Sequence, residues 1–281
     1  MLFRMFPERP LQGKATVLVT GASSGIGDEL AKLFARDGYR LVLVARDAAK
    51  LTAVAQELRQ RYSADAVVLS KDLALPASPD ELLGELRARA MPVDVLVNNA
   101  GFGSHGLFAE SDLPEQLRMI QVNVTALTHL TRVLLPGMLE RGWGRILNVA
   151  STAAFQAGPL MSVYYASKAY VLSFSEAVAN EVRGTGVAVT VLCPGPTLTD
   201  FQRRAGLEAT PLMGGRVMDA ATVALAGYRG LMDNKTVVIP GFRNRLVALA
   251  VRALPRDVVT AAVRRIQEKR PQPHNADTSE R

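Results

Sequence analysis

Tyr164 and Lys168, in the run Tyr164-Tyr165-Ala166-Ser167-Lys168, are the residues of this 281-residue chain whose types and spacing most directly suggest chemistry. Side chains four residues apart in a helix lie on one face. A lysine ammonium beside a phenol favours the phenolate, so a tyrosine with an ordinary pKa near ~10 becomes a usable acid or base at neutral pH. We predict that this pair moves a proton on or off an alcohol oxygen while a hydride moves at carbon. Tyr165 is the alternative phenol, and the spacing favours Tyr164.

The elements that must position this pair alternate along the chain as short apolar runs and amphipathic segments of helical period. The runs are rich in Val, Leu and Ile on both faces, which is typical of parallel strands covered by helices on each side. The sequence therefore predicts an α/β fold, a doubly wound parallel sheet of about seven strands. The expected strands are Ala15–Thr20, Arg40–Ala45, Ala66–Ser70, Val93–Asn98, Gly144–Ala150, Val187–Cys193 and Thr236–Ile239. The expected helices lie near 25–37, 47–61, 79–90, 114–141, 161–184 and 219–232.

A glycine-rich turn, Thr20-Gly21-Ala22-Ser23-Ser24-Gly25-Ile26-Gly27, follows the first predicted strand and opens the first helix. Gly21 permits a tight turn, Gly25 allows the backbone to approach a phosphate closely, and Gly27 lets helix and strand pack closely. Free N–H groups and the helix dipole at this point favour a pyrophosphate. We therefore predict that this turn binds a dinucleotide.

The end of the second predicted strand bears on which dinucleotide binds. A carboxylate there would bind the 2′-hydroxyl of an NAD ribose and repel a 2′-phosphate. This chain has Ala45 at that position and Arg46 next to it, and a guanidinium can bind a phosphate with two parallel donors. We expect NADP(H) in preference to NAD(H). The alternative is a solvated Arg46 paired with Asp47.

The order and spacing of the motifs resemble those of single-domain short-chain dehydrogenases/reductases over about residues 14–240. The matching motifs are TGASSGIG at 20–27, Asp72-Leu73, Asn98-Asn99-Ala100-Gly101, Ser151, Tyr164-x-x-x-Lys168 and Pro194-Gly195-x-x-x-Thr199. The resemblance implies a Rossmann-type fold and an NAD(P)-dependent oxidoreductase. It implies that Asp72 and Leu73 flank the adenine, that Asn98 and Ala100 lie by the ribose, and that Thr199 reaches the nicotinamide end. The complete set of expected cofactor contacts is Gly21, Ser23, Ser24, Gly25, Ile26, Gly27, Arg46, Asp72, Leu73, Asn98, Ala100, Gly101, Tyr164, Lys168, Pro194, Gly195, Thr197 and Thr199.

The expected catalytic residues are Asn123, Ser151, Tyr164 and Lys168. Ser151 can donate a hydrogen bond to a substrate oxygen that Tyr164 protonates, or deprotonates in the reverse direction. By resemblance, Lys168 also holds the nicotinamide ribose, and Asn123 supports a water link to Lys168. The alternatives are that Ser151 is a loop cap and Asn123 an ordinary polar residue in a helix.

Composition argues against several other classes of protein. The one cysteine, Cys193, precludes an internal disulfide, is expected to be a buried thiol, and fits a reducing, cytoplasmic setting. His105, His129 and His274 lack metal-ligand spacing, so no metal site is predicted. His105 could border the substrate cavity or lie in a solvated loop. Most of the formal charge of +7 falls within 243–270, so no nucleic-acid surface is expected. We also expect neither a secretory signal in residues 1–14 nor a transmembrane helix.

The chain is expected to form one catalytic domain over residues 1–241, with a basic and apolar helical extension over 242–270 and a disordered tail over 271–281. The extension either caps the substrate cleft, packs on a partner subunit, or lies on an anionic membrane surface. The helices near 114–141 and 161–184 resemble those that pair subunits in the family, so a homodimer or homotetramer is expected.

The loops at 152–160 and 197–217 are expected to shape the substrate site. Their apolar residues are Ala153, Ala154, Phe155, Leu198, Phe201, Leu207, Leu212 and Met213. An apolar lining favours a ketone, aldehyde or acyl substrate of small to medium size. The sequence thus predicts a carbonyl reductase or alcohol dehydrogenase. The alternatives are a non-catalytic dinucleotide-binding regulator or scaffold and a membrane-surface lipid-modifying reductase.

Overall fold

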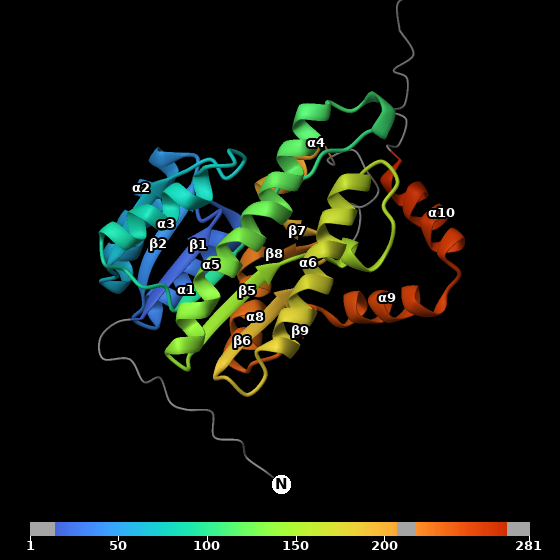
Figure 1. Ribbon diagram of the computed structural model, residues 1–281. Helices are drawn as coiled ribbons and strands as arrows, with labels where there is room; N and C mark the ends of the chain where they lie inside the picture. The colour runs from blue at the N-terminus through green and yellow to red at the C-terminus, as the bar shows by residue number, and fades with distance from the viewer. Residues whose placement is uncertain (1–14, 207–216, 269–281) are drawn as a thin grey trace, which may run out of the picture.

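The computed structural model describes residues 15–206 and 217–268, which form a three-layer α/β/α domain (Figure 1). Its central sheet has seven parallel strands in the order β3-β2-β1-β4-β5-β6-β9. The strands are β1 (Thr16–Thr20), β2 (Arg40–Ala45), β3 (Ala66–Ser70), β4 (Val95–Asn98), β5 (Gly144–Val149), β6 (Val187–Leu192) and β9 (Val237–Val238). Every predicted strand is present, within two residues of its expected bounds. The doubly wound parallel sheet is therefore confirmed.

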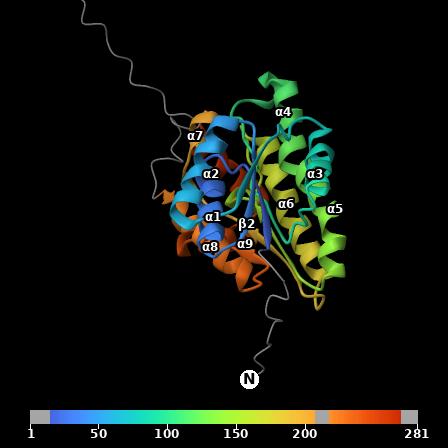
Figure 2. The ribbon, with the colours of Figure 1, turned by 90° about the vertical axis from the view of Figure 1, so that its left-hand side faces the viewer.

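Helices cover both faces of this sheet (Figure 2). On one side lie α1 (Gly25–Arg36), α2 (Ala48–Tyr62) and α8 (Ala220–Met232), and on the other lie α3 (Ser78–Ala88), α5 (Leu127–Glu140) and α6 (Ser162–Glu181). Strand side chains alternate between the two layers. Val17 and Val19 pack in the first apolar layer and Leu18 in the second, all fully buried. This two-sided burial explains why the strands read as continuous apolar runs.

The single helix predicted over 114–141 is wrong in one respect. The structure has α4 (Leu113–Ile120), a π-helical segment η2 (Gln121–Ala126) and then α5. A π-helical turn inserts a residue and rotates the following side chains relative to an α-helix. In this segment Asn123 is buried and its amide reaches the backbone of Phe102 and the hydroxyl of Ser167. The polar residue in the middle of the predicted helix is thus the centre of this irregular segment.

A buried polar network joins the two central strands to the helices behind them. Asn98 on β4 lies directly opposite Asn148 on β5 and donates to its Oδ1 at 2.9 Å and to Thr131 Oγ1 at 3.1 Å. Asn148 in turn donates to Ser175 Oγ of α6 at 2.9 Å. These four side chains are at least 97% buried. Paired in this way, they satisfy one another inside the apolar layer.

The segment after β9 forms two helices, α9 (Phe242–Ala253) and α10 (Arg256–Gln267), which project beyond α6 in Figure 1. They meet at Leu254-Pro255, where the proline excludes a continuous helix. The connection between β6 and α8 contains the short pair β7 (Thr197–Leu198) and β8 (Met218–Asp219), with α7 (Asp200–Arg204) between them in sequence. Among the described residues, no helix is long and apolar enough to cross a bilayer. The predicted tail at 271–281 and the predicted wall residues Leu207, Leu212 and Met213 lie outside the described residues.

Candidate active site

A cavity of about 520 Å³ lies at the carboxyl edge of the sheet. Its walls come from the loops that follow the first six strands and from α4, α6, α7 and the end of α10. This is the edge at which doubly wound sheets bind ligands. Most of the expected site residues line it: Gly21, Ser23, Ser24, Gly25, Ile26, Arg46, Asp72, Leu73, Ala100, Gly101, Ser151, Tyr164, Lys168, Pro194, Gly195, Thr197 and Thr199. Gly27, Asn98 and Asn123 do not line it.

The glycine turn has the conformation that a closely approaching ligand requires. Gly21 has φ 66° and Gly25 has φ 59°, a region that favours glycine. A Cβ at Gly21 would lie 2.8 Å from Asn99 Nδ2, and a Cβ at Gly27 would collide with the carbonyl oxygen of Gly21. Ser24, which precedes α1, makes no side-chain cap, so the first N–H groups of the helix remain available beside the cavity. The turn therefore fits the pyrophosphate that the sequence predicted.

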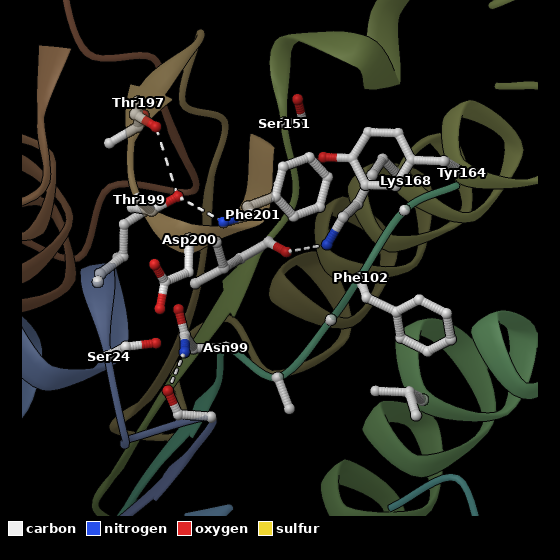
Figure 3. Close-up of a pocket in the computed structure, with 18 of the residues that line it drawn as sticks. Ser24, Asn99, Phe102, Ser151, Tyr164, Lys168, Thr197, Thr199, Asp200 and Phe201 are labelled. Carbon is white, nitrogen blue, oxygen red and sulfur yellow. Dashed lines mark hydrogen bonds between the residues drawn. The ribbon is translucent and has the colours of Figure 1, made fainter. Parts of the chain in front are cut away.

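Asn99 is a cavity residue that sequence reasoning missed. Its amide donates to Thr20 O at 2.9 Å and Gly21 O at 3.1 Å, so it braces the turn from the neighbouring loop (Figure 3). The side chain of Asn98, which was expected by the ribose, does not line the cavity, because it belongs to the buried network between β4 and β5. Strand alternation provides the reason: consecutive residues point to opposite sides, and only one Asn of the pair can face the turn.

The expected adenine end of the cavity is lined by Arg46, Asp72 and Leu73. Arg46 is exposed and, within the described residues, makes no ion pair. Its neighbour Asp47 instead caps α2, accepting from Lys50 N at 3.0 Å, which argues against the alternative of an Arg46–Asp47 pair. Lys71 is also near this end, but it pairs with Glu81 at 2.9 Å and Glu85 at 3.0 Å. At this end of the cavity, Arg46 is therefore the cationic side chain that is available to bind an anionic ligand.

Ser151, Tyr164 and Lys168 converge at the other end of the same cavity (Figure 3). The Tyr164 hydroxyl points towards the Ser151 side chain, which follows β5, and both residues face the cavity. Lys168, one helical turn along α6, donates to Val149 O at 2.9 Å, and its Nζ lies 5.8 Å from the centre of the Tyr164 ring. The spacing argument for Tyr164 over Tyr165 agrees with this geometry.

Comparison with known proteins identifies the family to which the chain belongs. The family model for short chain dehydrogenases matches residues 15–209. The chain belongs to the short-chain dehydrogenases/reductases. It is 38% identical over 230 residues to the ketoacyl reductase HetN of Nostoc sp., covering 82% of this chain and 79% of that one. Among solved structures, a short-chain dehydrogenase from Sphingobium yanoikuyae in complex with NADPH is 34% identical, with a TM-score of 0.77, covering 94% of this chain and 99% of that chain. A bulky-bulky ketone specific alcohol dehydrogenase from Comamonas testosteroni is 30% identical with a TM-score of 0.73, covering 85% and 92%.

Membership in this family makes the protein an NAD(P)-dependent dehydrogenase/reductase that acts on a CH–OH group or the corresponding carbonyl. The fit of the residues to a nicotinamide dinucleotide rests on this chain's own geometry. The turn at Gly21 and Gly25 has no room for a Cβ against Asn99 and Thr199, and the cavity extends from this turn to Tyr164. Bound there, the dinucleotide would supply or accept the hydride.

The electrostatics of this short-chain dehydrogenase/reductase differ from the expectation that Lys168 depresses the Tyr164 pKa. Burial raises the pKa of Tyr164, and the nearby Ser151 hydroxyl offsets only part of that effect. Burial also lowers the pKa of Lys168 from 10.5 to about 8. The lysine bonds to a carbonyl and lies over the ring rather than at the phenolic oxygen, which explains why its effect on the tyrosine is small.

Asn123 does not contact Lys168 directly. Its Oδ1 accepts from Phe102 N at 3.1 Å, and its Nδ2 donates to Phe102 O at 3.0 Å and Ser167 Oγ at 3.0 Å. These bonds tie η2 to the loop after β4 and to α6. Asn123 and Lys168 both lie beside Gly101, since a Cβ on Gly101 would lie 3.0 Å from Asn123 Oδ1 and 3.3 Å from Lys168 Nζ.

The substrate end agrees only partly with the predicted walls. Ala153 and Phe201 line the cavity, and the Phe201 ring centre lies 5.2 Å from that of Tyr164. Ala154 and Phe155 instead pack in a separate apolar cluster, and Leu198 points outward with 60% of its surface exposed. The walls that sequence reasoning missed include Phe102, Met161, Tyr165 and Gln267.

His105 is neither a solvated loop residue nor a lining residue of the main cavity. Its Nε2 lies 2.8 Å from the carbonyl oxygen of Gln267, and because a carbonyl only accepts, His105 is the donor. The ring therefore fastens the end of α10 over the cavity. Cys193 is buried at the end of β6, as expected, and burial raises the pKa of its thiol to about 12. In the described part of the chain, no cluster of three or more His, Cys, Asp or Glu residues could hold a metal ion.

Proposed function

We propose that this short-chain dehydrogenase/reductase is an NADP(H)-dependent carbonyl reductase for apolar ketones, with Tyr164 as the general acid. The observation that carries the proposal is the continuity of one cavity from the glycine turn to the neighbouring hydroxyls of Ser151 and Tyr164. The relatives named as ketoacyl reductases and the bulky-ketone alcohol dehydrogenase support a ketone as the reacting group. The apolar walls at Phe102, Met161 and Phe201 support an apolar body.

Each residue of the pair has a distinct role in the proposed reduction. Ser151 donates a hydrogen bond to the carbonyl oxygen and stabilises the negative charge that develops there. Tyr164 transfers its proton to the same oxygen as the hydride reaches carbon. Because burial alone disfavours a phenolate at Tyr164, the proton transfer requires a nearby positive charge. Lys168, with a pKa of about 8, is mostly protonated at pH 7 and is the cation beside the Tyr164 ring, with its Nζ 5.8 Å from the ring centre, so a bound substrate or cofactor must bring this charge to bear on the phenolic oxygen.

The preference for NADP(H) rests on Ala45 and Arg46. Strand β2 ends in Ala45, so it carries no terminal carboxylate that would repel a 2′-phosphate. Arg46 lines the cavity and makes no ion pair among the described residues. The NADPH complex of the Sphingobium yanoikuyae relative supports this choice, whereas the Burkholderia phymatum relative was solved with NAD. The proposal thus depends on residues of this chain rather than on the family as a whole.

Replacement of Tyr164 by Phe tests the proposal against the non-catalytic alternative. We expect kcat/KM for a panel of apolar ketones to fall about 10²- to 10⁴-fold, the usual contribution of a positioned acid. NADPH affinity, measured by fluorescence titration, should change little. Full activity in this variant would contradict the role of Tyr164. Tight NADPH binding by a wild-type protein that reduces no carbonyl compound would favour a regulator or scaffold.

The outward face of α9 supports a membrane-surface location. Asn244, Ala248 and Val251 face the body of the protein, and on the opposite side the helix exposes Phe242, Leu246 and Leu249. The segment 242–254 contains three arginines and no acidic residue. A symmetric contact between two copies would oppose these arginines to one another, whereas an anionic bilayer would neutralise them. We therefore favour an anionic lipid surface as the partner of the exposed face of α9.

Vesicle sedimentation tests this location. Wild-type protein should sediment with vesicles containing phosphatidylserine, and the double change Leu246→Glu and Leu249→Glu should abolish this without lowering activity on soluble ketones. Equal sedimentation with neutral and anionic vesicles, or none with either, would exclude the anionic surface. Leu75→Glu, at an exposed apolar residue after β3, provides a control outside the extension.

We also propose that the protein is a homo-oligomer paired through the α4–α6 face. This face exposes Leu117, Ile120, Val133, Leu139 and Tyr170. Burying such residues against a second copy would stabilise a symmetric contact. Light scattering of the wild-type protein and of Val133→Glu measures the state: a monomeric wild type contradicts the proposal.

A further inference from the structure

Gln267, at the end of α10, is a buried polar residue in the wall of the cavity. It has no exposed surface, and its Nε2 donates to the Tyr165 hydroxyl at 2.7 Å. Its Oε1 is buried and has no hydrogen-bond partner among residues 15–206 and 217–268. Buried polar atoms are normally paired, so an unpaired acceptor in a cavity wall indicates a group that is completed by a ligand.

The surroundings hold this side chain in place. The Gln267 carbonyl oxygen accepts from His105 at 2.8 Å, which fixes the end of α10 to the loop after β4. One helical turn and two turns earlier, Val263 and Val259 pack in the same apolar cluster as Met161 and Tyr165. Contacts on two sides therefore fix the position of the amide.

Gln267 and Tyr165 together offer one acceptor and one donor. The Tyr165 oxygen accepts from Gln267, so its own proton remains available to a ligand, while Gln267 Oε1 remains available to accept. A hydroxyl group both donates and accepts, and so it could satisfy both atoms. A methyl group in the same place would leave both atoms unsatisfied.

Gln267 and Tyr165 line the same cavity as Ser151 and Tyr164, but at a different position. Tyr164 and Tyr165 are neighbours on α6, with ring centres 6.0 Å apart in an edge-to-face arrangement. The Tyr164 hydroxyl points towards Ser151, and the Tyr165 hydroxyl accepts a hydrogen bond from Gln267. Phe102, Ala153 and Met161 contribute apolar surface to the same cavity.

We propose that Gln267 and Tyr165 form a second polar subsite, which recognises a hydroxyl group on the substrate away from the carbonyl that is reduced. The substrate class is then an apolar ketone with a distal hydroxyl. This inference rests on the proposed carbonyl reductase function and adds the group that orients the substrate. It also assigns a role to the C-terminal extension, because α10 supplies one of the two residues.

Pairs of ketones test the subsite. Each 2-alkanone is compared with the ketone of the same carbon chain that has a terminal hydroxyl, over a series of chain lengths, with NADPH in excess. At the length that spans the cavity, we expect wild-type kcat/KM to favour the hydroxyketone about tenfold. In Gln267→Met and in Tyr165→Phe this ratio should fall towards one. Ile266→Met, an exposed neighbour on α10, should keep the wild-type ratio.

Several outcomes would overturn the inference. Wild-type enzyme that reduces alkanones but shows no preference for a hydroxyl at any chain length lacks the subsite. A preference that persists in both variants places recognition elsewhere. If Gln267→Met does not fold, Tyr165→Phe decides the matter. If no ketone is reduced at all, the proposed function fails, and the rise in melting temperature caused by each ketone pair measures the subsite without turnover.

Discussion

Replacement of Lys168 by Met tests the electrostatic account of the site through stability alone. Burial lowers the pKa of Lys168 from 10.5 to about 8. Between these two values the unfolded chain binds more protons at this residue than the folded protein does. The free energy of unfolding therefore rises with pH in this window, and the cost of burying the ammonium is fully present below about pH 8.

The size of the effect follows from the separation of the two pKa values. About 2.5 pH units at 1.36 kcal/mol each correspond to a cost of about 3 kcal/mol at pH 7. Lys168→Met removes this cost and also removes the bond to Val149 O, which offsets about 1 kcal/mol at every pH. Relative to wild type, the variant should therefore gain about 3 kcal/mol more at pH 7 than at pH 10.5.

Urea unfolding followed by circular dichroism at several values between pH 7 and pH 10.5 measures this difference. Lys235→Met is a matched control, because the Lys235 side chain is 63% exposed, and its curve should run parallel to that of wild type. Titration of other groups is common to all three proteins and cancels in the comparison. Parallel curves for Lys168→Met and wild type would refute the argument that burial holds this lysine near pH 8.

Three further predictions concern the cofactor turn, the oxyanion contact and the phosphate contact. Gly27→Ala should lower the free energy of unfolding by about 2 kcal/mol or more, because the new Cβ collides with Gly21 O, whereas Gly84→Ala in α3 has open space and should be neutral or slightly stabilising in thermal unfolding. Ser151→Ala should reduce kcat about 100-fold in steady-state assays with unchanged NADPH affinity; a loss of affinity instead would make Ser151 a structural cap. Arg46→Gln should raise the KM for NADPH about 10- to 100-fold and leave that for NADH within about twofold, and equal effects on both would contradict a 2′-phosphate contact.

The sheet could be predicted from sequence because each strand is apolar on both faces, a pattern that does not depend on distant residues. The glycine turn could also be predicted from sequence, because Gly21 and Gly25 adopt positive φ values that other residues disfavour. The chemistry at Tyr164 and Lys168 followed from helical spacing within one element.

The remaining features depend on contacts between distant segments. Gln267 meets Tyr165 across 102 positions of sequence, and no local pattern indicates that contact. The Tyr164 pKa depends on burial by several elements together, so spacing from Lys168 gave the wrong direction. The choice between Asn98 and Asn99 depended on the orientation of one strand end, which the dipeptide alone does not specify.

The paired asparagines of β4 and β5 have a consequence for folding. Parallel strands of Val, Leu and Ile can slide past one another by a residue or two with little change in apolar contact. Asn98 and Asn148 lie opposite each other in only one alignment of β4 and β5. Any other alignment would leave two buried amides without partners among aliphatic side chains, and each unpaired amide would cost about 1–3 kcal/mol of stability. The Asn98–Asn148 pair therefore disfavours misaligned registers of β4 and β5. It also fixes the relative positions of the two loops that follow these strands and carry Asn99 and Ser151.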